Sequence, residues 1–186
     1  MNNANEIHTE HSFSYFYRMT IRLATLNDIP GVMRVINEVV PLMRASGNFQ
    51  WDDTYPNAAV FEEDIALGQL WVADADGDIA GVTAITTEQY PEYADVGMDI
   101  NETAMVTHRL AVSTRYRGQG VAALLLQQAE QVAIDRDIKT LRIDTNTANE
   151  ATNSLFPKLG YVFAGEIGLR FRPGLRFYCY EKRLDG

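Results

Sequence analysis

The chain has 186 residues, of which 46% are hydrophobic and 22% are charged, as in globular proteins with an apolar core. Its formal net charge of −9 argues against nucleic acid as a main partner, and no apolar run approaches the ~18 residues of a membrane-spanning helix. The single cysteine, Cys179, cannot form an internal disulfide, and no signal-peptide pattern opens the chain. We therefore expect a cytoplasmic protein without a membrane partner.

The first 18 residues are polar and then aromatic, and we interpret them as an N-terminal extension that is partly ordered. Residues 19–186 read as a single domain, because no repeat or linker divides them. His8 and His11 are spaced by three, but the chain supplies no further ligands near them, so no metal site is predicted.

The first half of the domain alternates short strands and helices. A strand is predicted at 21–24, and a helix begins near Asn27 and Asp28 with Pro30 in its first turn and ends at Pro41. A second helix spans 61–67 and ends at Gly68. Strands at 69–73 and 79–86 flank an Asp-Gly turn, which predicts a hairpin.

Two long loops interrupt this pattern. Residues 45–56 mix aromatic with acidic side chains, and they either line an acceptor pocket or cap the core. Residues 88–103 are rich in acids, so they form either a solvated surface or a site that attracts a cationic or amine-bearing substrate.

Residues 106–130 combine a strand, a glycine-bearing basic turn and an amphipathic helix. The turn reads Arg117-Gly118-Gln119-Gly120-Val121-Ala122, and it lacks both the Gly-Lys-Ser/Thr of phosphate loops and the Gly-x-Gly-x-x-Gly of dinucleotide folds. A helix that begins there leaves backbone N–H groups bare, and the helix dipole makes them an anion site. Glycine lets a ligand approach the backbone, and Arg115 and Arg117 add positive charge.

The second half continues with a strand at 141–145, a helix from Asn149 to Lys158 that Gly160 closes, and two strands after it. Pro157 is unusual inside that helix because it removes one backbone donor. The complete order is β-α-α-β-β-β-α-β-α-β-β, with hairpins first and a βαβ crossover later. This order predicts an α/β fold with a mixed sheet and helices on both faces.

The Arg-x-x-Gly-x-Ala pattern at 117–122, after a Leu110-x-Val112 strand, resembles the pyrophosphate-binding motif of the GNAT superfamily of acyl-CoA-dependent acetyltransferases. Asn149 and residues 155–161, Leu-Phe-Pro-Lys-Leu-Gly-Tyr, are similar to a second motif of that family, Asn followed by Leu-Tyr-x-Lys-x-Gly-Phe. The resemblance covers residues 19–184. It implies a GNAT-like central mixed β-sheet in which the parallel strands 106–112 and 141–145 splay apart.

The resemblance also implies an activity: an N-acetyltransferase that passes acetyl from acetyl-CoA, without a metal, to an amine of a small molecule, amino acid or protein. The alternative is a non-catalytic acyl-CoA-binding regulatory module. Dimers are common in the family, so a homodimer is also considered. The implied cofactor-binding residues are Leu110, Ala111, Val112, Arg115, Arg117, Gly118, Gln119, Gly120, Val121, Ala122 and Asn149.

Catalysis by direct transfer needs a base for the amine, and His108 in the central strand is a candidate because its usual pKa suits proton transfer near neutrality. An inert histidine packed in the sheet is the alternative, and Glu102, Asp144 and an acid of the 88–103 loop are rival bases. In the family a tyrosine often serves as the acid, but Phe156 stands at that position and has no proton to donate. The acid therefore stays unassigned.

Overall fold

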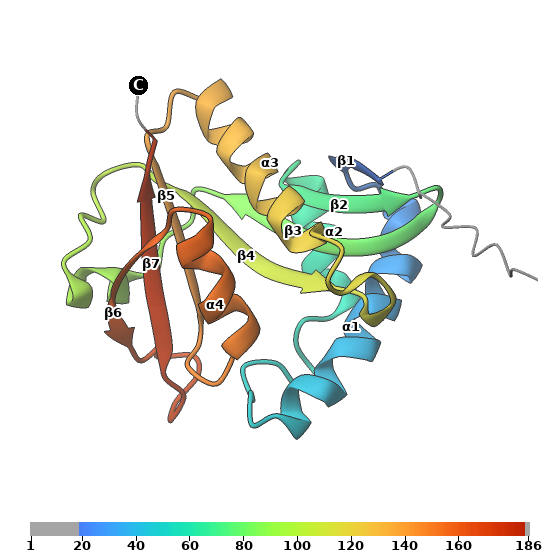
Figure 1. Cartoon of the computed structure of the whole chain (residues 1–186), viewed down its shortest axis with the longest axis horizontal. Coiled ribbons are helices and arrows are strands. Elements are labelled where there is room, and N and C mark those ends of the chain that lie inside the picture. Colours follow the sequence, from blue (N-terminus) through green and yellow to red (C-terminus); the bar gives the residue numbers. More distant parts are fainter. Residues whose placement is uncertain (1–18, 185–186) are drawn as a thin grey trace, which may run out of the picture.

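A computed structural model describes residues 19–184 of the chain. The N-terminal extension at 1–18, with His8 and His11, lies outside the described residues. Within the described part, one seven-stranded mixed sheet carries helices on both faces (Figure 1). None of the helices described is both long enough and apolar enough to cross a lipid bilayer.

The strands and helices occur in the predicted order. Their bounds are β1 (Met19–Leu23), α1 (Ile29–Ala45), α2 (Ala58–Ala66), β2 (Leu70–Ala75), β3 (Asp78–Thr86), β4 (Met105–Val112), α3 (Val121–Asp135), β5 (Thr140–Asn146), α4 (Glu150–Lys158), β6 (Val162–Ile167) and β7 (Phe177–Arg183). Short 3₁₀ helices η1 (Leu26–Asp28), η2 (Pro91–Val96) and η3 (Thr114–Tyr116) lie between them.

The predicted end of the first helix at Pro41 is wrong, because α1 continues through Pro41 to Ala45. A proline inside a helix removes one backbone donor, but here the residues on both sides pack on the core. Val39 and Val40 are buried before the proline, and Met43 packs against the same apolar cluster after it. Tertiary packing therefore outweighs the local preference to stop.

The sheet order is β1-β2-β3-β4-β5-β7-β6, and β4 and β5 are the parallel neighbours at its centre. Their pairing covers only Met105 to Thr107 against Leu141 to Ile143. Beyond Thr107, β4 runs on to Val112 with no partner on its β5 side, and the two strands diverge in Figure 1. The expected splay between the parallel strands is confirmed.

Two apolar layers fix the helices on opposite faces of the sheet. Neighbouring residues of β2 point to opposite sides: Val72 packs in the cluster that holds α1, and Ala73 packs in the cluster that holds the start of α3. At Gly81 on β3 a Cβ would lie 2.9 Å from Val121 Cγ1, so glycine lets α3 approach the sheet closely. This approach sets the position of the α3 N-terminus.

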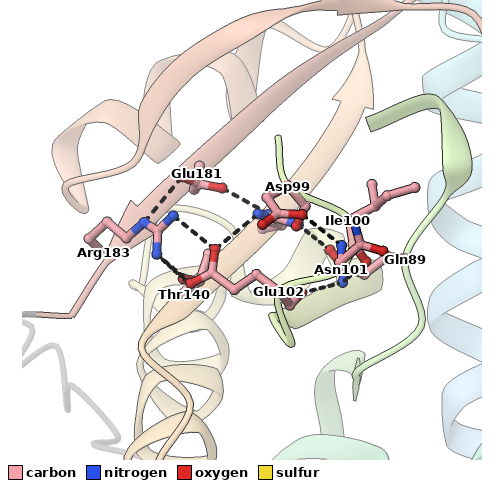
Figure 2. A network of polar contacts seen from close by, with 9 residues as sticks. Gln89, Asp99, Ile100, Asn101, Glu102, Thr140, Glu181 and Arg183 are labelled. Atoms are coloured by element: carbon pink, nitrogen blue, oxygen red, sulfur yellow. Dashed lines mark hydrogen bonds and ion pairs between the residues drawn. The ribbon is translucent and has the colours of Figure 1, made fainter. Parts of the chain in front are cut away.

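The paired end of β4 and β5 is held by a polar network (Figure 2). Arg142 on β5 is fully buried and donates to Glu181 on β7, to the Asp99 carbonyl and to Gln89. Glu102 accepts from Thr140 and pairs with Arg183 (Figure 2). This network attaches the loop between β3 and β4 to the closed end of the strand pair.

Candidate active site

A groove of about 830 Å³ opens where β4 and β5 separate. Its walls come from the end of β4, the turn before α3 with the first turn of that helix, the C-terminal part of α1, and α4. Of the predicted cofactor-binding residues, it is lined by Leu110, Ala111, Val112, Arg117, Gly118, Gly120, Val121, Ala122 and Asn149. The fold therefore brings together in one groove residues from two motifs that are about 30 positions apart in the sequence.

The turn before α3 has the geometry of an anion site. Gly118 and Gly120 adopt φ of 74° and 79°, a region that favours glycine, and the space beside both Cα atoms is open. Gly120 is the N-cap of α3 and has no side chain to cap it. Within residues 19–184, no acceptor contacts the N–H groups of Val121, Ala122 or Ala123, so these donors face the groove unfilled.

The two arginines of the turn differ in their surroundings. Arg117 lines the groove and forms no ion pair with any part of the chain that the structure describes. Arg115 instead pairs with Asp78 at 3.0 Å, and its guanidinium stacks near the Tyr116 ring. The Gln119 side chain donates to the Arg115 carbonyl. Neither Arg115 nor Gln119 lines the groove, so their predicted contact with a cofactor has no support in the geometry.

A second, smaller cavity of about 80 Å³ adjoins the groove at the point of splay. The groove and the cavity are neighbours, because both are lined by Leu110, Asn149 and Thr152. Asn149 caps α4 by accepting from the Thr152 N–H, and its amide donates to Thr145 Oγ1 at 3.1 Å. An elongated ligand in the groove would thus present its end to the smaller cavity.

A β-bulge in β4 shapes the wall between the two spaces. Ala84 pairs with His108 and Val82 with Ala111, so two residues of β4 oppose Thr83 alone. Arg109 lies in this bulge with φ of 55°, and its guanidinium makes two hydrogen bonds of 2.8 and 2.7 Å to the buried Asp64. This bidentate pair anchors the bulge to α2, because Asp64 belongs to that helix.

His108 lines the smaller cavity and is buried. Its Nε2 lies 3.1 Å from the Glu88 carbonyl, so Nε2 carries the proton and Nδ1 keeps a lone pair in the neutral ring. Burial lowers the pKa of His108 to about 4, because the charged ring would lose its hydration. The imidazole is therefore neutral near pH 7, and its basicity is low.

Asp144 on β5 lies in the same cavity, immediately after the last paired residue. Its Oδ1 accepts a 2.6 Å hydrogen bond from the Tyr93 hydroxyl. Burial raises the pKa of Asp144 to about 6, although the Tyr93 hydrogen bond acts in the opposite direction. Carboxyl groups with such values in a cavity are typical of proton-transfer sites.

Less favourable for catalysis are the positions of Glu102, Phe156 and Cys179. Glu102 lines neither space and is engaged by Thr140 and Arg183 at the closed end of the sheet. Phe156 lines the small cavity, where its ring packs edge-on against Tyr180 at 5.2 Å. Cys179 is buried, and burial raises its thiol pKa well above the ordinary value, which disfavours a reactive thiolate.

Sequence reasoning missed several residues of the small cavity. Tyr90 packs edge-on against His108 and at a tilt against Phe171, with ring centroids 5.2 and 5.1 Å away. Arg172 also lines the cavity, and the buried Thr107 Oγ1 finds no hydrogen-bond partner in the described part of the chain. These residues lie in loops or on strand faces without a local motif, so only their spatial convergence identifies them. No cluster of His, Cys, Asp and Glu suited to a metal occurs within residues 19–184.

Comparison with known proteins supports one family. The family model described as Acetyltransferase (GNAT) family matches residues 36–161. YesJ of Bacillus subtilis (strain 168), an uncharacterized N-acetyltransferase, is 27% identical over 147 residues, which are 76% of this chain and 81% of that protein. Other curated relatives are matched over only 34% to 52% of their own lengths, so their whole-protein activities are not carried over.

Solved structures give the same result. A GNAT-family acetyltransferase of Streptococcus agalactiae 2603 aligns with a TM-score of 0.77 and 29% identity, covering 92% of this chain and 99% of that one. The structure of Salmonella typhimurium YncA with its cofactor acetyl-CoA aligns with a TM-score of 0.66 over 91% and 95% of the two chains, and at 19% identity it shows the fold alone. The family model covers more than half of the sequence, so the chain belongs to the acetyltransferase (GNAT) family.

Proposed function

We propose that this protein is an N-acetyltransferase that passes the acetyl group of acetyl-CoA directly to an amine. The observation that carries the proposal is a continuous path. It begins at the unfilled N–H groups of Val121 and Ala122, follows the unpaired edge of β4, and ends at the cavity that holds the two candidate bases, His108 and Asp144. This order suits a ligand with an anionic group at one end, an arm in the middle and a reacting group at the other end.

The residues present fit acetyl-CoA. The open space beside Gly118 and Gly120 and the bare amides of the first α3 turn suit a diphosphate, and Arg117 adds one charge. The unpaired edge at Leu110 to Val112 suits the amide groups of the pantetheine arm, and Asn149 faces it from α4. The bound cosubstrate supplies an activated thioester, and these residues hold and orient it.

The acceptor amine must lose a proton before or during attack, and two groups in the cavity can receive it. Asp144 is the better matched base, since a carboxyl with a pKa of about 6 is ionised at neutral pH and still accepts a proton readily. His108 is the other candidate through its Nδ1 lone pair, but its pKa of about 4 makes it the weaker base. We therefore assign the proton transfer to Asp144 in preference to His108.

No acid is assigned for the departing thiolate. Phe156 cannot donate a proton, and the rate then relies on the stability of the coenzyme A thiolate itself. This same feature favours the second candidate function, a module that binds acyl-CoA for regulation and does not transfer the acyl group.

That the protein forms a homodimer stays a prediction.

Thiol release from acetyl-CoA, measured with and without a panel of amines, separates the two functions. An N-acetyltransferase releases thiol in proportion to the acetylated amine, which mass spectrometry identifies. If acetyl-CoA binds by calorimetry but no small amine, amino acid or peptide stimulates release, the regulatory module is the correct reading.

A further inference from the structure

Three charged side chains line the small cavity among the residues described: Arg109, Asp144 and Arg172. The acids of residues 88–103 contribute no carboxylate to its wall. Glu92 pairs with Arg170 and Glu102 with Arg183, while Glu88 offers only its carbonyl to His108. The cavity thus contains more arginine than carboxylate, which does not favour a polycationic acceptor.

The charge of Arg109 is already matched. Its Nε and Nη2 donate to the two oxygens of Asp64, and Nη1 lies 3.3 Å from the Tyr55 hydroxyl. With its guanidinium satisfied inside the protein, Arg109 has little left for a ligand.

Arg172 differs from Arg109 in this respect. Its Nη1 makes one long contact of 3.3 Å to Asp52 Oδ2, and the guanidinium lies 4.8 Å from the Tyr55 ring centroid. The other oxygen of Asp52 accepts from Thr54 and from the Tyr55 N–H, so that carboxylate also stabilises its own turn. In the described structure no acceptor contacts Nε or Nη2 of Arg172, although its side chain is only 19% exposed. Two guanidinium nitrogens, Nε and Nη2, are therefore free beside the cavity.

We propose that the acceptor is a small amino carboxylate, such as an α-amino acid, whose carboxylate binds Arg172. This inference rests on the proposed acetyltransferase function. Arg172 supplies the forked, charged donors that a carboxylate matches, and Asp144, in the same small cavity, faces the amine. Tyr90 and Phe171 form an aromatic wall for the apolar part of the acceptor. A cavity of about 80 Å³ suits a small molecule better than a folded protein surface.

The test compares matched acceptors in the thiol-release assay. Each L-amino acid of a panel is paired with its carboxamide and its decarboxylated amine, and kcat and KM are measured for all three. We expect amino acids to exceed both analogues in kcat/KM by about 10- to 100-fold, the effect of one charge-assisted hydrogen-bonded pair. The carboxamide is the decisive comparison: its amine is less basic and has the larger neutral fraction near pH 7, so amine basicity alone would place the carboxamide above the amino acid.

Variants identify the residue responsible. Arg172→Gln should raise KM for amino acids by about 10- to 100-fold and leave decarboxylated amines unchanged, and Arg172→Lys should recover part of the loss. Arg170→Gln is the matched control, because Arg170 lies two residues away, is exposed and does not line the cavity. Melting temperature and the Kd for coenzyme A confirm that each variant is folded and binds the cosubstrate.

Two results would overturn the inference while the acetyltransferase function stands. In the first, carboxamides or simple amines have a kcat/KM equal to that of the matching amino acids. In the second, Arg172→Gln weakens all acceptors equally. A complete lack of amine-stimulated thiol release would instead reject the acetyltransferase function itself, and the amino-carboxylate assignment with it.

Discussion

The Tyr93 hydroxyl donates a 2.6 Å hydrogen bond to Oδ1 of Asp144, and this pair joins the loop between β3 and β4 to the first residue of β5 beyond its pairing with β4. Tyr93 is buried, and the same loop presents the Glu88 carbonyl to His108. The loop therefore controls the surroundings of both candidate bases, and the closed-end network in Figure 2 holds that loop in place.

Removing the Asp144 carboxylate should abolish most of the turnover. In Asp144→Asn, kcat should fall about 100-fold or more, the usual contribution of a general base, while the Kd for acetyl-CoA changes little. The parent enzyme should lose activity as pH falls through about 6, because protonated Asp144 cannot accept a proton. This acidic limb should be absent from the residual activity of the variant. If Asp144→Asn keeps the acidic limb of the pH–rate profile near pH 6, Asp144 is not the base. If the limb lies near pH 4 and His108→Gln removes it, the base is His108.

The Tyr93 hydrogen bond lowers the pKa of Asp144, so its loss should raise that pKa. Tyr93→Phe removes the hydroxyl alone and should move the acidic limb of the rate profile upward by about one pH unit. Tyr161→Phe is a suitable control, since its buried hydroxyl lies in a different apolar cluster from Tyr93 and has no hydrogen-bond partner within residues 19–184. A limb that stays in place in Tyr93→Phe would show that another group titrates.

The raised pKa of Asp144 also predicts a cost in stability. Between about pH 4 and pH 6 the unfolded chain has released this proton and the folded chain has not, so the free energy of unfolding should fall as pH rises. Asp144→Asn removes this dependence and should gain up to about 3 kcal/mol above pH 6, with no gain below pH 4. Urea unfolding of both proteins at pH 4 and pH 8 measures the difference in their free energies of unfolding. A difference that is the same at both pH values would contradict the prediction.

The diphosphate site can be blocked at Gly120. Gly120→Glu should abolish coenzyme A binding, because a carboxylate would enter the space in front of the bare α3 amides. Gly120→Ala carries a similar backbone strain of about 1 kcal/mol at φ of 79° without the charge, so it should bind with only a modest loss. Calorimetric titration measures both. Normal binding by Gly120→Glu would refute the site.

The two arginines of the turn provide a matched pair. Arg117→Ala should weaken coenzyme A binding about tenfold, because Arg117 lines the groove. Arg115→Ala should leave affinity almost unchanged, because that side chain is turned to Asp78. The same titration measures both variants, and a larger loss for Arg115→Ala than for Arg117→Ala would overturn the placement.

The polar network at the paired end of β4 and β5 should depend on Arg142 for its contribution to stability. Arg142→Ala leaves the Glu181 carboxylate without its buried partner and opens a cavity, so the free energy of unfolding should fall by about 3–5 kcal/mol. Arg183→Ala removes another arginine from the same network, but Arg183 is more than half exposed and should cost less than about 1 kcal/mol. Chemical unfolding compares the two, and similar losses would contradict this explanation.

Much of the fold could be read from the chain. The order of strands and helices was predicted because hydrophobic spacing, Gly68, the Asp-Gly turn and the N-cap Asn149 are local signals. The glycine-bearing turn before α3 was predictable for the same reason, since Gly118 and Gly120 lie within a few residues of the helix that they precede. Local preference failed at Pro41, where packing of α1 extends the helix.

The acceptor end of the site depends on contacts that no local pattern encodes. Asp144, Tyr90 and Arg172 come from a strand and two loops, and only the sheet order and the splay of β4 from β5 bring them to one cavity. The different environments of Arg115 and Arg117 depend on Asp78, which is 37 residues before Arg115. The sequence by itself determined the elements and the glycine-bearing turn before α3, because those arise from neighbours along the chain. The tertiary structure alone decided which side chains are buried, paired or left free, because burial and pairing depend on long-range packing.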